Sequence, residues 1–208
     1  MRLGARKLNP VVAARAGARI VRRQGIDRVT MRSVAAAIGV TPMALYRCFD
    51  SADALRLASI SEALERIPDP PRDGSVRERL EAWAQTARRR LRATDGLAAA
   101  CLTDWPALPA GCRMMEGLLA VAADHAESTI RQCEIANAVF VYAVTRAQAE
   151  RAVLARGSTR QLPAVEARPK QYPHLAALEH RFAVIDVDRH FAVGLDALLV
   201  GLLADGDR

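Results

Sequence analysis

The segment from Thr41 to Arg47 holds the side chains whose chemistry is easiest to name. Arg47 can donate two parallel hydrogen bonds, which is what a guanine edge in the major groove of DNA accepts. The hydroxyl groups of Thr41 and Tyr46 suit phosphate oxygens of the DNA backbone. The segment therefore predicts a DNA contact in which Arg47 reads a base. The residues that we expect at the DNA are Arg32, Thr41, Pro42, Met43, Ala44, Tyr46, Arg47, Cys48 and Ser51.

Other chemistry has no support in the residue pattern. The sequence has no glycine-rich phosphate loop, nucleophile elbow or metal-binding pair, so we expect no enzyme, no metal and no cofactor. Asp186, Asp188 and His190 are close together, but acidic residues are common where a helix begins. The cysteines are too far apart for a metal motif, and we expect buried or half-buried thiols, with thiol sensing as the alternative. They are Cys48, Cys101, Cys112 and Cys133.

Three short helices are needed to position the 41–47 segment. Thr30 is suited to cap the second helix, which Gly39 ends, and Thr41 caps a third that begins with Pro42. A helix, a turn with glycine and a second short helix form a helix-turn-helix, whose second helix can enter the major groove. The three helices are expected over 10–25, 31–38 and 42–48.

The remainder of the chain also has helical periodicity and no strand-like alternation, so the predicted fold is all-α. Proline and glycine between 68 and 74 predict a loop, and a polar stretch over 156–173 predicts another. We expect a DNA-binding domain over 1–51 and a larger domain over 52–208, with the helix over 52–67 as connector. The further helices are expected over 51–67, 75–94, 96–104, 112–124, 128–155, 174–183 and 186–203.

The positive charge is concentrated at the start of the chain. Residues 1–51 contain ten basic and two acidic residues, a net charge of +8, while the whole chain has +7. A basic head on a nearly neutral body suits a module that binds a polyanion such as DNA. No apolar run approaches the roughly 20 residues that span a bilayer, and the arginine-rich start does not resemble a signal peptide. We therefore expect a cytoplasmic protein without a membrane partner.

Several segments together resemble one known family. Residues 25–47 read GIDRVTMRSVAAAIGVTPMALYR, and they closely resemble the DNA-binding signature of the TetR (tetracycline repressor-like) family. The similarity is strongest over 9–65. LPAGCRMME at 108–116 and FAVGLDALLVGL at 191–202 look like segments of that family's ligand-binding and dimerisation domain. The resemblance implies a repressor that binds a palindromic operator as a dimer and is released by a small apolar effector. A regulator that responds to no ligand is the alternative.

Two positions depart from the family pattern. The family usually has a histidine where this chain has Cys48, and a lysine that touches phosphate where it has Ala52. Without that lysine, each subunit has one backbone contact fewer, which lowers the affinity and its dependence on salt. Arg47 or Arg32 could compensate.

The resemblance also indicates where the effector and the partner subunit would bind. It places the effector among the helices from about 75 to 155, where the expected lining is Trp83, Trp105, Met114, Cys133, Asn137 and Phe140. The helix over 128–155 is apolar on two sides and the last helix nearly all round, which predicts a four-helix bundle between two copies. The expected interface residues are Phe191, Gly194, Leu195, Leu198, Gly201 and Leu202.

Overall fold

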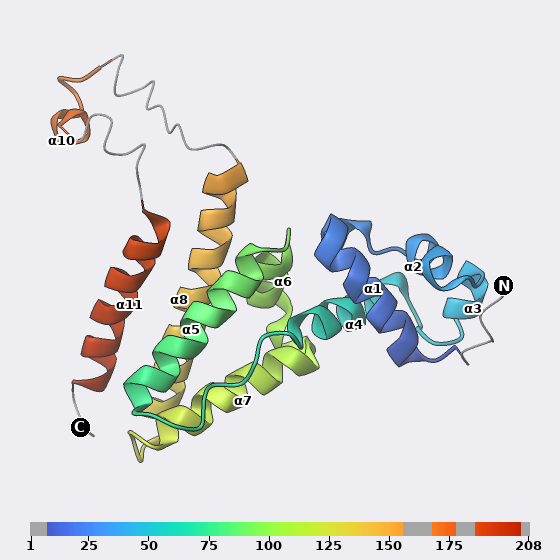
Figure 1. Cartoon of the computed structure of the whole chain (residues 1–208), viewed down its shortest axis with the longest axis horizontal. Helices are drawn as coiled ribbons and strands as arrows, with labels where there is room; N and C mark the ends of the chain where they lie inside the picture. Colours follow the sequence, from blue (N-terminus) through green and yellow to red (C-terminus); the bar gives the residue numbers. More distant parts are fainter. Residues whose placement is uncertain (1–7, 156–167, 178–185, 205–208) are drawn as a thin grey trace.

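The computed structural model describes residues 8–155, 168–177 and 186–204, which form helices and no strand (Figure 1). The all-α prediction is confirmed. The loop expected over 156–173 and the helix expected over 174–183 lie partly outside these residues. The helices are α1 (Pro10–Gln24), the 3-10 helix η1 (Ile26–Arg28), α2 (Met31–Ile38), α3 (Pro42–Leu45), α4 (Ala52–Leu64), α5 (Val76–Arg92), α6 (Leu97–Asp104), the 3-10 helix η2 (Trp105–Ala107), α7 (Pro109–Ala123), α8 (Thr129–Ala155), α10 (Pro173–Ala176) and α11 (Val187–Leu203).

Figure 1 shows the N-terminal helices α1–α3 at one end of the molecule and the bundle of α5–α8 behind them, with α4 leading from one to the other. α11 packs alongside α8. We call α1–α3 the head and α5–α8 with α11 the body. None of the described helices is both long and apolar enough to cross a membrane.

The helix starts follow local capping chemistry. Thr30, Thr41, Ser51 and Ser75 each accept a hydrogen bond from the backbone N–H three residues later, at 3.0–3.3 Å. These side chains satisfy donors that the first turn of a helix leaves free, so they fix where each helix begins. The caps expected at Thr30 and Thr41 are therefore confirmed, and Ser51 and Ser75 cap α4 and α5 in the same way.

The head is held to the connector by a close crossing of α1 and α4. Gly17 of α1 and Ser59 of α4 are both buried at the crossing point, and a Cβ atom on Gly17 would lie 2.6 Å from Ser59 Cβ. The Ser59 hydroxyl donates to the Leu55 carbonyl at 2.7 Å, so this buried polar group is satisfied within its own helix. Because glycine has no side chain, the two helix backbones can approach closely here.

The body is a layer of α5, α7 and α8 with α6 and α11 against it. Tyr142 of α8 donates to the Phe191 carbonyl of α11 at 3.0 Å, and Gly194 leaves the space that the Tyr142 ring occupies. A Cβ atom at Gly194 would lie 3.0 Å from Tyr142 Cζ. Large side chains buried in the body are Leu80, Trp83, Leu91, Leu108, Met114 and Phe140.

A partly buried ion cluster joins three helices of the body. Arg88 of α5 donates to Glu150 of α8 at 2.7 Å, and their side chains are only 5% and 2% exposed. Arg88 also donates to Asp188 at the start of α11, and its guanidinium carbon lies 4.4 Å from the centre of the Phe191 ring. The hydrogen bond from Arg88 lowers the pKa of Asp188. A buried charge must be paired in this way, and the pairing fixes the relative positions of the helices.

Replacing Gly17 by Ala should lower the free energy of unfolding by about 1–3 kcal/mol, because the new methyl group would overlap the Ser59 side chain. The second change Ser59→Gly should restore part of the loss, since it removes the atoms that clash. Urea unfolding at one fixed protein concentration measures both effects. Equal stability of G17A and the parent would contradict the close crossing.

Candidate nucleic-acid interface

The turn between α2 and α3 places the short second helix of the motif. Gly39 has a φ of 73°, in the left-handed region that favours glycine, and ends α2. The Val40 N–H donates to the Ala35 carbonyl at 3.0 Å, which closes the turn. Leu45 is fully buried and Phe49 nearly so, and both belong to the hydrophobic core. These anchors hold α3 in one orientation on the head.

Most of the residues expected at the DNA lie on the surface of this motif. Met43 is 72% exposed and Tyr46 49%. Cys48 is half-buried and Ala44 is buried, so the structure does not bring the Ala44 side chain to the surface with the others. The Thr41 and Ser51 oxygens accept the capping hydrogen bonds, which leaves their hydroxyl protons as donors. The other exposed residues of the set are Arg32, Thr41, Pro42, Arg47 and Ser51.

Arg32 and Arg47 carry the positive charge of this surface. Both are exposed, and neither takes part in the ion pairs that the described residues form. An arginine without a carboxylate partner keeps its donors available for a base edge or a phosphate. The arrangement can thus bind a polyanion through α3 and the start of α2.

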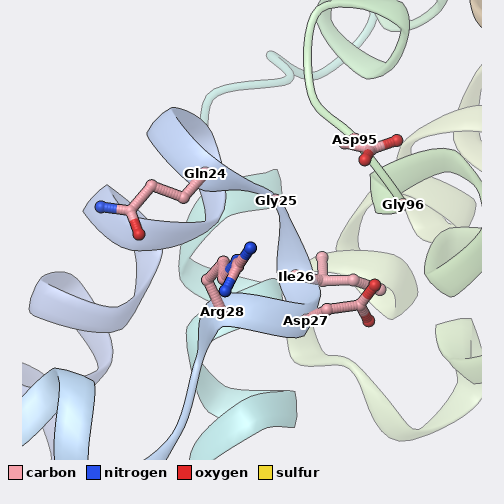
Figure 2. A pocket seen from close by; sticks show the side chains of 7 residues that line it. All are labelled: Gln24, Gly25, Ile26, Asp27, Arg28, Asp95 and Gly96. Atoms are coloured by element: carbon pink, nitrogen blue, oxygen red, sulfur yellow. The ribbon is translucent and has the colours of Figure 1, made fainter.

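The head also touches the body at a joint that the sequence did not reveal. Gly25 (φ 88°) leads into η1, and Gly96 (φ 74°) lies at the start of α6. A Cβ atom on Gly96 would lie 2.6 Å from Ile26 Cγ1, so the Ile26 side chain rests on the Gly96 backbone. A polar hollow of about 400 Å³ lies beside this contact. Figure 2 shows the residues that line it, with Asp95 and Gly96 across from η1. We call the Ile26–Gly96 contact the joint.

The aromatic residues expected around an effector meet inside the body. The Phe140 ring lies 6.3 Å from the Trp83 ring and 6.0 Å from the Trp105 ring, measured between centres. Trp83, Met114 and Phe140 are each 1% exposed, and Trp105 is half-buried. The buried Trp83 Nε1 donor has no hydrogen-bond partner among the described residues. An unpaired buried N–H is costly, so this donor is a polar contact that a bound molecule could use.

The remaining two residues of that set lie elsewhere. Cys133 and Asn137 are exposed on α8, where they line an open apolar hollow of about 380 Å³ with Ile130. The structure therefore does not bring them to the cluster of Trp83, Trp105 and Phe140, which we call the Trp83 cluster. They share one face of α8 because they are spaced three to four residues apart, whereas Ile135 and Val139 take the buried face.

The residues expected at a dimer interface are divided between two faces of α11. Phe191 and Leu195 are buried within their own subunit, and Gly194 is half-buried against Tyr142. Leu198 and Leu202 are half-buried, while Gly201 is exposed with open space around it. The outward face also presents Val193 and Val200, which are 61% and 55% exposed.

Comparison with known proteins decides the family. Residues 14–58 match the family described as "Bacterial regulatory proteins, tetR family", and residues 67–205 match "Tetracyclin repressor-like, C-terminal domain". The chain belongs to the TetR family. Members of this family are transcriptional regulators that bind DNA, and they are not enzymes. The resemblance seen in the sequence is therefore confirmed. A comparison with curated protein sequences gives no match.

Solved structures of TetR regulators share the fold. ActR from Streptomyces coelicolor in complex with (S)-DNPA is 22% identical, with a TM-score of 0.74, over 95% of this chain and 98% of that chain. BioQ from Mycobacterium smegmatis is 23% identical, with a TM-score of 0.72, over 96% and 100%. BioQ with its double-stranded DNA operator is 21% identical, with a TM-score of 0.69, over the same shares of the two chains. At these identities the likeness concerns the fold alone.

Replacing Arg47 by Ala should cost about 1–3 kcal/mol of binding free energy at one base position in each half-site, because the bidentate contact is lost. Preference for that base should be relaxed while binding to unrelated DNA changes less. Selection from a randomised DNA pool, followed by titration of the parent and R47A, measures both. Arg90→Ala is the matched control, since Arg90 is exposed on α5 in the body. An unaltered base preference in R47A would remove Arg47 from this role.

Proposed function

We propose that this TetR regulator represses transcription in the cytoplasm by binding a palindromic operator as a homodimer, and that a small, largely apolar effector releases it. The observation that carries the effector is the Trp83 N–H group, which is buried in an aromatic cluster and has no hydrogen-bond partner in the described parts of the chain. Arg47, which is exposed in the turn just after α3, supports the operator contact. The two recognition helices of a dimer must lie about one DNA turn apart, roughly 34–36 Å, so a change in their spacing prevents binding.

The proposed dimer uses the outward faces of α8 and α11. On α11, Val193, Val200 and Gly201 are exposed on a helix whose other face is already packed in its own body. On α8, Ile130 is 72% exposed beside Cys133. Two such faces brought together by a twofold axis would bury apolar surface that a monomer leaves in water.

The effector class follows from the lining of the proposed site. Trp83, Trp105, Met114 and Phe140 offer aromatic and thioether surface, which favours a flat or apolar molecule. The Trp83 N–H can only donate, so the effector should carry an oxygen or nitrogen acceptor. Burial raises the pKa of the Cys101 thiol to about 12, which keeps this thiol protonated and unreactive. This favours effector binding over thiol sensing at Cys101.

Two connections could carry the effect of a bound molecule to the head. The connector α4 crosses α1 at Gly17 and Ser59, and the joint places Ile26 against Gly96 at the start of α6. A shift of α6 that makes room for an effector would therefore press on η1. Coupling of about 1–3 kcal/mol between the two sites would suffice for a useful switch.

Replacing Val200 by Arg should convert the dimer to monomers, because it places a charge in the proposed apolar interface without disturbing the subunit core. Val11→Arg is the control, since Val11 is a similarly exposed valine, 52% against 55%, on α1 of the head. Sedimentation velocity at several concentrations measures the association state. A V200R protein that stays dimeric would contradict the proposed interface.

Both tryptophans of the chain are in the Trp83 cluster, so intrinsic fluorescence should change when an effector binds there. Genomic DNA fragments selected by the protein identify its operator, and compounds that shift the fluorescence are then tested for operator release. Trp83→Phe should weaken an active compound about 2–10-fold, because one neutral hydrogen bond is lost. Trp105→Phe is the comparison, since it keeps an aromatic ring in the lining, and it should weaken the compound less than Trp83→Phe does. A compound that releases the operator equally well from W83F and the parent would remove Trp83 from the effector site.

A further inference from the structure

A third hollow, of about 290 Å³, lies between α1 and the end of α4. It is unusual in its charge, because four arginines and two glutamates form its wall together with Ala18. We call it the arginine pocket. Its charged residues are Arg15, Arg19, Arg22, Glu62, Glu65 and Arg66.

The two glutamates of the arginine pocket are already paired. Glu62 accepts from Arg15 at 3.3 Å, and Glu65 accepts from Arg113 of α7 at 3.1 Å. Arg113 also bonds to Asp69 and to the Ile67 carbonyl, so it is fully engaged at the end of α4. Arg19, Arg22 and Arg66 take part in none of the ion pairs formed by the described residues. Three guanidinium groups therefore face one hollow, and no carboxylate of the described residues is paired with any of them.

The positive charges of these three arginines repel one another when no anion is bound. Burial, followed by the nearby guanidinium groups of Arg66 and Arg19, lowers the pKa of Arg22, and Glu62 offsets this only in part. Arg22 is held on α1 and Arg66 follows α4, so the crossing at Gly17 and Ser59 keeps them together. An anion placed between them would replace this repulsion by charge-assisted hydrogen bonds.

We propose that the arginine pocket binds a phosphate-bearing small molecule through Arg19, Arg22 and Arg66. The planar fork of a guanidinium group matches two phosphate oxygens, so three such groups suit a phosphate or diphosphate better than a single carboxylate. The pocket is separate from the Trp83 cluster, so it would respond to a second ligand.

The position of the arginine pocket argues against a contact with the operator backbone. Ser51, at the start of α4, is among the residues expected at the DNA, and Glu62 lies eleven residues farther along the chain. A helix rise of about 1.5 Å per residue separates them by about 17 Å along α4. The pocket is thus at the body end of the connector, where a bound anion would fasten α1 to the end of α4.

Thermal unfolding of the full chain with pyrophosphate, at constant ionic strength, tests the proposal. Pyrophosphate should raise the Tm by roughly 3–6 °C at ten times its Kd, and calorimetric titration should give that Kd. In the double variant R22Q/R66Q the rise should disappear, while the Tm without pyrophosphate stays equal or increases because the repulsion is removed. The charge-matched control R89Q/R90Q changes two exposed arginines of α5 and should keep the full rise.

Three results would overturn the proposal. One is an equal Tm rise with sodium chloride at the same ionic strength, which would mean screening alone. Another is an equal loss of the rise in R22Q/R66Q and R89Q/R90Q. In the last, the parent does not bind pyrophosphate, while R22Q/R66Q binds the operator more weakly and its operator affinity depends less on salt. That result would assign these arginines to the DNA backbone.

A lysine variant keeps the test decisive if the glutamine variant does not fold. R22K/R66K retains both charges but loses the guanidinium forks, so its pyrophosphate affinity should fall several-fold while its fold is retained. Far-UV circular dichroism reports the helix content of each variant. Unchanged affinity in R22K/R66K would show that the forks hold no phosphate and would also overturn the proposal.

Discussion

The crossing of α1 and α4 is the contact on which the rest of the molecule depends. α4 is packed against the head at one end and tied to α7 by Arg113 at the other, so it belongs to both parts. The crossing needs a residue without a side chain at Gly17 and only a small side chain at Ser59. Because the crossing fixes the distance between α1 and α4, it holds α3 at a defined angle to the body. It also brings the arginines of α1 beside Arg66. The surface proposed to bind DNA and the arginine pocket both depend on this one close approach.

The parts of the fold that local chemistry determines could be predicted from the sequence. Thr30, Thr41, Ser51 and Ser75 act as N-caps because the hydrogen bond that each makes spans only three residues. The helix-turn-helix was predictable for the same reason, and its glycine turn and buried Leu45 are short-range features. The expectation of a dimer and of an effector came from the family resemblance, because no local pattern contains either.

Contacts between distant segments could not be predicted in the same way. Nothing in residues 25–28 indicates a 3-10 helix that meets Gly96, because the partner lies some seventy residues farther on. The helix over 128–155 was expected to be apolar on two sides, but periodicity alone did not separate Phe140, which is buried, from Cys133 and Asn137, which are exposed. Similarly, Phe191 and Leu195 face their own subunit. The Phe191 ring packs against Arg88, and the Phe191 carbonyl accepts a hydrogen bond from Tyr142.

The cluster of Arg88, Glu150 and Asp188 has a consequence for assembly. It fastens the start of α11 to α5 and α8 within one chain, while Arg131 holds the other end by a 2.7 Å hydrogen bond to the Leu202 carbonyl. A helix secured at both ends loses little conformational entropy when a second copy arrives. Two subunits can then meet as preformed surfaces, so the rate of pairing is governed by their encounter and orientation and not by the folding of α11.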